Sequence, residues 1–268
     1  MIIFLIILLL IAVLYLLSTR CRKGHPGLEA LRGWSYAHRG LHEAGIPENS
    51  MAAFRAALDA GYGIELDVHL LSDGTLAVMH DSSLKRTVGV DKILEDLTAE
   101  DLTRYHLQGT EQTIPTFSQV LELYAGKAPL IVELKAYRNN HAALTKAACD
   151  LMDRYSGPYC MESFDPRCVQ WLRKNRPDII RGQLTENFLA SKAPIHPLLK
   201  FGITHQMGNF LSLPDFVAYK FADRKTLSNL LARGFWGAQG VTWTLKTKED
   251  YDTAVAEGWL PIFEGFRP

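Results

Sequence analysis

Two acidic residues interrupt a run of the sequence that otherwise has the pattern of a buried β-strand. In "IELDVHLLSDGTLAVMHD", residues 64–81, Glu65 and Asp67 are two positions apart. Side chains of a strand alternate between its two faces, so both carboxylates point the same way, about 7 Å apart. Two buried carboxylates without a partner would cost several kcal/mol. We therefore expect a positive group between them, either a divalent cation or a basic side chain such as Arg39 or Lys135.

The donor atoms indicate which metal such a site would prefer. Carboxylate oxygens are typical ligands of Ca²⁺ and Mg²⁺, whereas Zn²⁺ prefers histidine or cysteine. Glu133 interrupts the apolar pattern of "LIVELK" in the same way as Glu65 and offers a third carboxylate. From these residues alone, one divalent cation and a set of buried ion pairs are equally open.

The elements that position these residues follow an alternating pattern. From Trp34 onward, short apolar runs alternate with amphipathic segments, which is typical of β/α units around a parallel sheet. Helices are expected at about 49–60, 116–125, 138–155, 166–175, 224–233 and 247–256. Strands are expected at 34–38, 62–68, 130–134, 159–163, 179–183, 215–221, 239–244 and 260–264. This pattern predicts an α/β fold, a (β/α)₈ TIM barrel.

A further apolar run, residues 75–79, lies too close to the second strand to be its parallel neighbour. Parallel strands need a crossover of about a dozen residues or more, and only six residues, including Asp73-Gly74, separate these two runs. The two runs are therefore predicted to form a hairpin with its turn at 72–75. In that register position 71 faces 76, 69 faces 78, and Asp67 lies beside His80.

The N-terminus has the composition of a membrane anchor. The first 17 residues, "MIIFLIILLLIAVLYLL", carry no charge, and Arg20, Arg22 and Lys23 follow them. At about 1.5 Å per residue this length is at the short end of what crosses a membrane, and no basic region precedes it as in a signal peptide. We expect a transmembrane helix over residues 1–18, a basic juxtamembrane linker over 19–33 and one barrel domain over 34–268. The basic flank predicts a single-pass membrane protein with a cytoplasmic barrel.

The overall charge argues against one class of partner. Lys plus Arg and Asp plus Glu both number 29, so no global positive field attracts nucleic acid, and no nucleic-acid partner is expected. The four cysteines show no CxxC spacing, which predicts free thiols rather than a disulfide scaffold.

Several motifs in a fixed order resemble those of a known family. The run from "AHRGLHEAGIPENS" through "GIELDVHLLSDGTLAVMHD" contains HRG, PENS, E-x-D and a later HD, and "IPTFSQVLEL" and "IVELK" follow. "MESFDP" and "VTWTL" are similar to later barrel strands of the same family. Over about residues 34 to 245 the chain resembles the glycerophosphodiester phosphodiesterase family.

The resemblance implies a (β/α)₈ barrel with a small insertion after the second strand, here about residues 82–114. It implies that a divalent cation is held by Glu65, Asp67 and Glu133. It also implies that His38 and His80 are the general acid and base and that Arg39 helps to hold the phosphate. These roles agree with phosphodiester hydrolysis, in which a cation neutralises the phosphate oxygens while one group removes a proton and another donates one.

Other polar residues keep two interpretations. Lys135 shares the strand face of Glu133, and it either contacts the phosphate or forms a salt bridge at the barrel mouth. Trp243, near the end of a late strand, either forms a wall of the substrate pocket or packs in the core. Glu48 of the PENS motif either contacts metal or substrate or caps the helix that follows.

The sequence departs from the family pattern in two places. The family's last strand usually ends in Thr-Asp, whereas this chain has Phe263-Glu264 at that place, which leaves the strand's contribution to the site open. Residues 186–221 match poorly and are expected to form a lid, a membrane-facing edge or part of the barrel wall.

The function that follows is hydrolysis of small-molecule glycerophosphodiesters to glycerol phosphate and an alcohol, with one divalent cation, Ca²⁺ or Mg²⁺. A lysophospholipase D-like activity on membrane lysophospholipids is the alternative within enzymes. A catalytically silent module that binds lipid headgroups is the alternative outside them. The presence of both histidines favours an enzyme, because a binding module does not need them.

Overall fold

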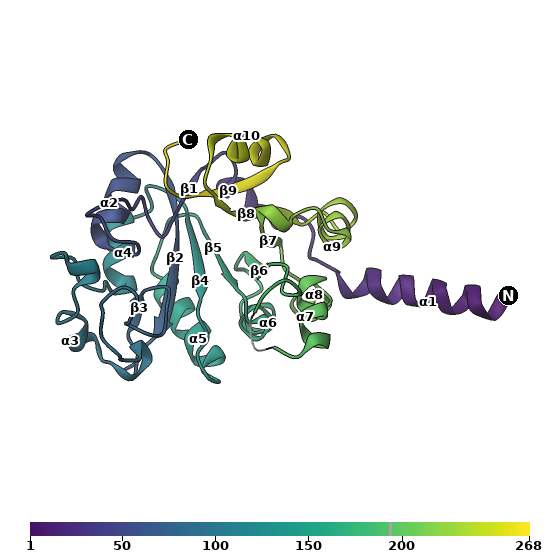
Figure 1. The fold of residues 1–268 in the computed structure, drawn as a ribbon, viewed down its shortest axis with the longest axis horizontal. Helices are drawn as coiled ribbons and strands as arrows, with labels where there is room; N and C mark the ends of the chain where they lie inside the picture. The colour runs from purple at the N-terminus through teal and green to yellow at the C-terminus, as the bar shows by residue number, and fades with distance from the viewer. Residues whose placement is uncertain (193–194) are drawn as a thin grey trace.

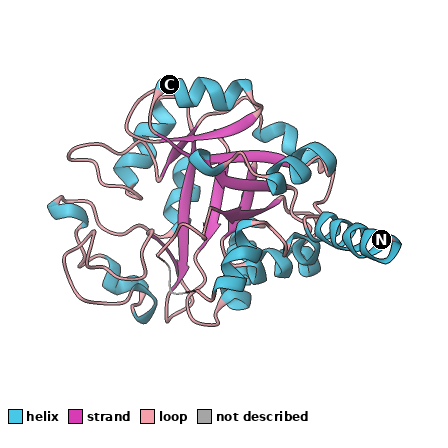
Figure 2. Ribbon diagram, turned by 45° about the vertical axis from the view of Figure 1, so that its right-hand side comes forward, coloured by secondary structure: helices cyan, strands magenta, loops and turns pink. Residues whose placement is uncertain are grey.

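The computed structural model describes residues 1–192 and 195–268, and its centre is a closed barrel of parallel strands (Figures 1 and 2). Each strand pairs in parallel with the next, and β1 closes the barrel by pairing with both β2 and β9. The barrel strands are β1 (Tyr36–His38), β2 (Gly63–Leu70), β4 (Leu130–Leu134), β5 (Tyr159–Ser163), β6 (Arg181–Thr185), β7 (Phe216–Lys220), β8 (Gln239–Leu245) and β9 (Trp259–Phe263). The predicted eight-stranded TIM barrel is confirmed.

Helices cover the outside of the barrel (Figure 2). They are α2 (Met51–Asp59), α4 (Phe117–Tyr124), α5 (His141–Met152), α6 (Pro166–Asn175), α7 (Pro197–Thr204), α8 (Asn209–Ser212), α9 (Leu227–Leu230) with the π-helical η5 (Leu231–Phe235), and α10 (Lys248–Ala256). Local sequence explains where several begin: Asp165 accepts a hydrogen bond from the first turn of α6, and Thr116 and Gln119 form a capping box at α4. The short helices α7 and α8 lie in the segment 186–221 that resembled the family poorly.

The core has two layers. The outer layer packs the strands against the helices, and Phe54, Leu66 and Phe117 are fully buried in it. The inner layer fills the barrel below the site and includes Leu31 from the 3₁₀ helix η1 (Pro26–Leu31), while the Tyr36 hydroxyl donates a hydrogen bond to the Leu31 carbonyl. All four cysteines are free and buried, as predicted.

The hairpin forms, but its register differs by one residue from the prediction. β3 (Leu76–Val78) pairs antiparallel with β2, and His69 faces Ala77 rather than position 78. The Met79 amide donates to the Asp67 carbonyl, so Asp67 faces Met79 and not His80. The reason is the loop, which has three residues, 72–74, and ends on Gly74 at φ +87°. A three-residue loop with glycine in the left-handed conformation is a common hairpin connection, and it places one more residue between the strands than the predicted turn.

Residues 82–114 contain three short elements: η2 (Leu94–Asp96), α3 (Ala99–Leu102) and η3 (Leu107–Gly109). They form a small apolar cluster of their own with β3 and its neighbours, in which Leu84, Leu94 and Met79 are buried. That this segment is an insertion relative to the family stays a prediction.

The N-terminal helix α1 (Ile2–Ser18) projects from the barrel on the side of α7, α8 and α9 (Figure 1). Within residues 1–192 and 195–268, no helix has the length and apolar character needed to span a bilayer, and α1 has 17 residues. The transmembrane helix predicted over residues 1–18 is therefore not found. Residues 19–33, predicted as a linker, lie against the barrel, where Arg22 forms an ion pair with Asp215.

Candidate active site

The predicted site residues gather at the carboxyl-terminal ends of the strands, where TIM barrels place their active sites. Two adjoining cavities of about 40 and 220 Å³ lie there and share His80, Glu133 and Phe164. The smaller is also lined by His38, Arg39, Glu65, Glu162, Leu184, Trp243 and Ile262. The larger is also lined by His69, Ser82, Leu134, Lys135, Ala136, Ser163 and Asp165. The structure thus brings seven of the eight predicted site residues to these cavity walls.

The eighth, Asp67, completes a buried carboxylate cluster with Glu65 and Glu133. The three side chains are 1–5% exposed, and one oxygen of each lies within 4.8 Å of the others. The period of two along β2 puts Glu65 and Asp67 on one face, and the parallel register places Asp67 beside Glu133 on β4. The structure thus places Glu65 and Asp67 on one face, as their spacing predicts, with Glu133 beside them; metal binding by the three stays a prediction.

Asp67 has basic partners. Lys135 Nζ lies 3.0 Å from Asp67 Oδ1 and 2.8 Å from Glu133 Oε1, and Arg39 Nε lies 3.5 Å from Asp67 Oδ2. Asn49 Nδ2 donates to Asp67 Oδ2 at 2.8 Å. Lys135 and Arg39 therefore form the ion pairs that the sequence left open as the alternative to a metal.

Glu65 has weaker partners than Asp67. Its Oε2 accepts a hydrogen bond of 3.3 Å from the Arg39 amide and lies 3.9 Å from His38 Nε2. Within the described residues no Lys or Arg side chain pairs with it within 4.0 Å. Ion pairing therefore satisfies one side of the cluster and leaves the Glu65 side without a cation.

The pKa values follow this division. Burial, together with the charges of Asp67 and Glu133, raises the Glu65 pKa well above its usual range. Burial also raises the Glu133 pKa to about 7, although Lys135 opposes it. At Asp67 the charges of Lys135, His80 and Arg39 outweigh burial and hold its pKa far below the usual range.

The charges of the cluster fit a divalent cation. Glu162 on β5 is a fourth buried carboxyl group on the cavity wall, and burial together with Glu133 raises its pKa. When all four carboxyl groups are ionised, Arg39 and Lys135 leave two negative charges uncompensated, which equals the charge of one divalent ion. The ligand set consists of oxygen atoms alone, which suits Ca²⁺ or Mg²⁺.

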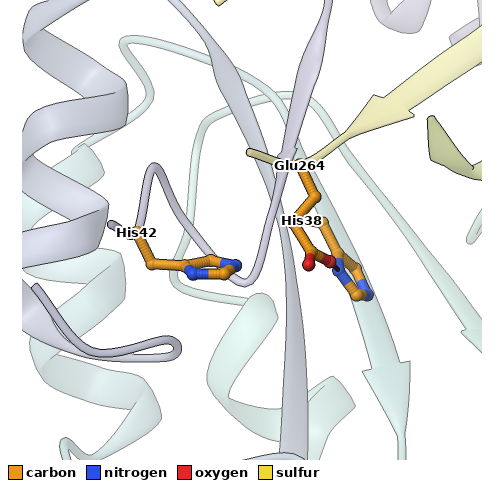
Figure 3. Close-up of side chains that lie close together, drawn as sticks. All are labelled: His38, His42 and Glu264. Carbon is orange, nitrogen blue, oxygen red and sulfur yellow. Dashed lines mark hydrogen bonds and ion pairs between the residues drawn. The ribbon is translucent and has the colours of Figure 1, made fainter. Parts of the chain in front are cut away.

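His38 is held by a residue that the sequence left undecided. Its Nδ1 lies 2.6 Å from Glu264 Oε2, and Figure 3 shows the Glu264 carboxylate beside the His38 ring. The hydrogen bond with His38 lowers the Glu264 pKa to about 2, so the carboxylate is ionised and accepts the Nδ1 proton. Burial lowers the His38 pKa, and Glu264 partly opposes this. The Nε2 atom is thereby left on the Glu65 side of the ring, available for proton transfer.

His42 also lies near this pair (Figure 3). One ligand atom each of His38, His42 and Glu264 lies within 4.8 Å of the others. Because Glu264 already engages His38 Nδ1, this group orients the histidine.

His80 is oriented by its sequence neighbour. Its Nδ1 lies 2.6 Å from Asp81 Oδ1, and Arg86 Nε donates to Asp81 Oδ2 at 2.5 Å. Burial lowers the His80 pKa, against the charge of Asp67. Both histidines therefore have one ring nitrogen engaged by a carboxylate, and each lines the smaller cavity.

Glu48 does not cap the helix that follows it. It accepts a hydrogen bond of 2.9 Å from Arg39 Nη1 and two more from Arg86, whereas Ser50 caps α2 by accepting from the Ala53 amide. The capping interpretation is wrong, and Glu48 instead positions the Arg39 guanidinium at the cavity.

Trp243 and two residues that sequence reasoning did not select complete the site. The Trp243 ring lines the smaller cavity and packs edge-on against Phe164, with ring centroids 5.7 Å apart. Glu162 and Asp81 were missed. Glu162 carried a signal, because it interrupts the strand "YCMES" as Glu133 interrupts "LIVEL". The only sequence feature that pointed to Asp81 was its place in the HD motif.

Comparison with known proteins agrees with this architecture. A glycerophosphodiester phosphodiesterase of Bacillus altitudinis is 39% identical over 107 residues, which cover 37% of this chain and 43% of that protein. A lysophospholipase D of Homo sapiens is 31% identical over 133 residues, 45% of this chain and 41% of that protein. The chain therefore spans less than half the length of each of these two relatives.

Solved structures share the fold. A phosphodiesterase of Oleispira antarctica, whose crystals contain the product sn-glycerol-3-phosphate, superposes with a TM-score of 0.71 at 19% identity, covering 88% of this chain and 94% of that one. The glycerophosphoryl diester phosphodiesterase family matches residues 38–263, which include every predicted site residue. The chain belongs to the glycerophosphoryl diester phosphodiesterase family.

Proposed function

We propose that the chain hydrolyses glycerophosphodiesters to glycerol phosphate and an alcohol. The observation that carries the proposal is the cluster of buried carboxylates at the barrel mouth, with two carboxylate-bound histidines on the wall of the same cavity. A pair of groups that can donate and accept protons beside a charged anchor for phosphate is what phosphodiester hydrolysis requires.

Glu65, Asp67 and Glu133 would hold one divalent cation, Ca²⁺ or Mg²⁺. When bound, such a cation neutralises negative charge on the phosphate oxygens. Arg39 and Lys135 lie against the same carboxylates and would bind the remaining phosphate oxygens, and Trp243 would form the apolar wall for the alcohol.

His38 and His80 would exchange protons with the attacking and leaving oxygens. Glu264 accepts the Nδ1 proton of His38, so the opposite nitrogen carries out the transfer. Burial lowers the pKa of both histidines, which favours their neutral forms, so either can begin as the base.

Hydrolysis of glycerophosphocholine by the full chain, with and without excess chelator, tests this function. We expect chelation to abolish turnover and Ca²⁺ or Mg²⁺, but not Zn²⁺, to restore it. His80→Asn should lower kcat by at least about 100-fold while metal binding persists, and the exposed His106→Asn is the matched control. Full turnover in excess chelator would remove the metal from the proposal, and full activity of His80→Asn would remove the acid–base pair.

Two other functions are separated by the same assays. A lysophospholipase D-like activity would favour lysophospholipids over deacylated substrates, and one relative bears that name. A silent headgroup-binding module would bind both without turnover.

We further propose that α1 associates with a membrane. The side chains of Ile2, Phe4, Leu9 and Leu14 are more than half exposed, and α1 contains no charged residue, so it presents an apolar surface to solvent. Cosedimentation of the full chain with phospholipid vesicles, against a variant lacking residues 1–18, tests the association. The cytoplasmic location of the barrel stays a prediction.

A further inference from the structure

An apolar groove lies outside the barrel beside the active site. It has a volume of about 330 Å³ and runs between α7 and the outward face of β6. One wall consists of Phe164, Pro166, Gln183 and Thr185, and the other of Leu199, Gly202, Ile203, Gln206, Met207, Gly208, Asn209 and Leu211. We name this hollow the α7 groove.

The α7 groove adjoins the catalytic cavities through one side chain. Phe164 lines the groove and both cavities of the candidate active site. Its ring packs edge-on against Trp243 on the cavity side and against Phe188 at 6.0 Å. A molecule whose phosphate lies at the carboxylate cluster could therefore extend past Phe164 into the groove.

The protein leaves the groove unfilled where a side chain would fit. Gly202 lies within α7 at an ordinary φ, and a Cβ there would meet no atom within 4 Å; the same holds at Gly208. Glycine weakens a helix relative to alanine, so neither local conformation nor packing accounts for Gly202. A glycine at this position keeps the groove open.

The chemistry of the α7 groove suits a hydrocarbon. Among the residues that the structure describes, no charged one lines it, and its polar groups are engaged: Gln183 donates to the Ser163 carbonyl and Thr185 to the Ile203 carbonyl. Leu199 and Leu211 line its walls and are about half exposed, so the groove opens to the surface between apolar side chains. Its volume is at the small end of ligand pockets, about 300–1,000 Å³, which favours one chain over the two of a diacyl lipid.

We propose that the α7 groove binds the single hydrocarbon chain of a lysophospholipid whose phosphodiester occupies the catalytic site. The inference rests on the proposed phosphodiester hydrolysis; it takes lysophospholipids, the alternative substrates given above, and assigns the site that holds their hydrocarbon chain. Apolar contact with the chain adds affinity to each substrate in proportion to the methylenes buried.

The test compares full-chain variants on glycerophosphocholine and on lysophosphatidylcholines of increasing chain length, all below their micelle-forming concentrations. Gly202→Trp adds a ring at a position where the Cβ has no atom within 4 Å. Leu198→Trp is the matched control, because Leu198 lies on the same helix, is 77% exposed and does not line the groove. Binding of the same lipids in excess chelator, measured by calorimetry, gives a second readout that needs no turnover.

We expect kcat/KM to rise by up to about fourfold per added methylene until the groove is full. Gly202→Trp should remove this rise, weaken lysolipid binding at least tenfold and leave glycerophosphocholine hydrolysis unchanged, while Leu198→Trp changes neither. Hydrolysis without chain-length dependence would reject the proposal that the groove binds the hydrocarbon chain and leave the proposed function intact. Equal loss on both substrates in Gly202→Trp would also overturn it. Absence of all turnover would reject the proposed function. The calorimetry would then test lipid binding by the groove on its own: equal lysolipid binding by Gly202→Trp and Leu198→Trp would reject the groove proposal.

Discussion

The two carboxylates of β2 should have opposite effects on the stability of the metal-free protein. Asp67 lies between Lys135 and Arg39, at 3.0 and 3.5 Å, whereas Glu65 has only a backbone amide and His38 nearby. We therefore expect Asp67→Asn to lower the free energy of unfolding and Glu65→Gln to raise it. Both changes preserve side-chain shape and remove a charge. The difference between their effects on the free energy of unfolding therefore reflects the different partners of the two carboxylates.

The magnitudes follow from the contacts. Removing one member of a buried ion pair costs about 3–5 kcal/mol, and an amide keeps part of the hydrogen bonding, so Asp67→Asn should cost about 3 kcal/mol. Burial raises the Glu65 pKa, so the folded metal-free protein disfavours the ionised form; protonating a carboxyl of ordinary pKa at pH 7 would cost about 3–4 kcal/mol. Glutamine needs no proton, so Glu65→Gln should stabilise the metal-free protein by up to about 3 kcal/mol.

The pH dependence of the two stability changes gives a second check on their opposite signs. The Asp67 pKa is lowered on folding, so its stabilisation is present above the unfolded pKa and is lost as the pH falls through the folded value. The Glu65 pKa is raised, so its penalty is absent below the unfolded pKa and grows as the pH rises. Between pH 7 and pH 4 the stabilisation by Glu65→Gln should therefore shrink, whereas the cost of Asp67→Asn should persist until the pH falls well below 4.

Urea unfolding of the full chain at pH 7 and at pH 4, in excess chelator and followed by circular dichroism, measures both effects. Calcium and magnesium titrations of the same variants should show that each substitution weakens metal binding. Equal destabilisation by both substitutions, or a stable Asp67→Asn protein that keeps its metal affinity, would refute the assignment of partners.

Three further predictions concern neighbouring positions. Leu66 is fully buried between β2 and the covering helices, so Leu66→Ala should lower the free energy of unfolding by about 2–5 kcal/mol, while calorimetry finds metal affinity unchanged. Glu264→Gln should lower the His38 pKa, because Glu264 raises it; the limb of the pH–rate profile that reports His38 should move to lower pH, and an unchanged profile would argue against this contact. Gly74→Ala should cost about 1–2 kcal/mol, measured by urea unfolding, because Gly74 is at φ +87°; a neutral effect would argue against the three-residue hairpin loop.

The carboxylates of the site were predictable from local periodicity, whereas His38, His80 and Arg39 were selected by the resemblance to the family. The alternation of side chains on β2 placed Glu65 and Asp67 on one face, and the second interrupted strand pointed to Glu133. The register of the hairpin was not predictable in this way. A two-residue type I′ loop needs positive φ at both Asp73 and Gly74, whereas the three-residue loop needs it at Gly74 alone; the structure has positive φ at Gly74 and not at Asp73.

Other features depend on contacts between distant segments. The apolar residues of 186–221 favoured burial in the barrel wall and left a lid or a membrane-facing edge open, because composition does not show which side of α7 faces β6. The structure assigns both roles within one helix: Ile203 faces the groove, and Leu198 faces solvent. The N-terminal run was apolar enough to suggest a membrane span, yet the helix it forms ends at Ser18, where Thr19 and the Trp236 indole meet.

The closure of the barrel explains why the last strand contributes a residue to the candidate site despite its departure from the family pattern. β1 pairs with β9, and Ala37 lies opposite Phe263. The next residue on each strand is therefore brought to the same edge, so positions 38 and 264 are neighbours whatever residues occupy them. The sequence left the contribution of Phe263-Glu264 open because it could not show which strand closes against the first. Once the closure is known, a carboxylate at position 264 is expected to lie beside His38, and Glu264 provides that carboxylate and accepts the hydrogen bond from His38 Nδ1.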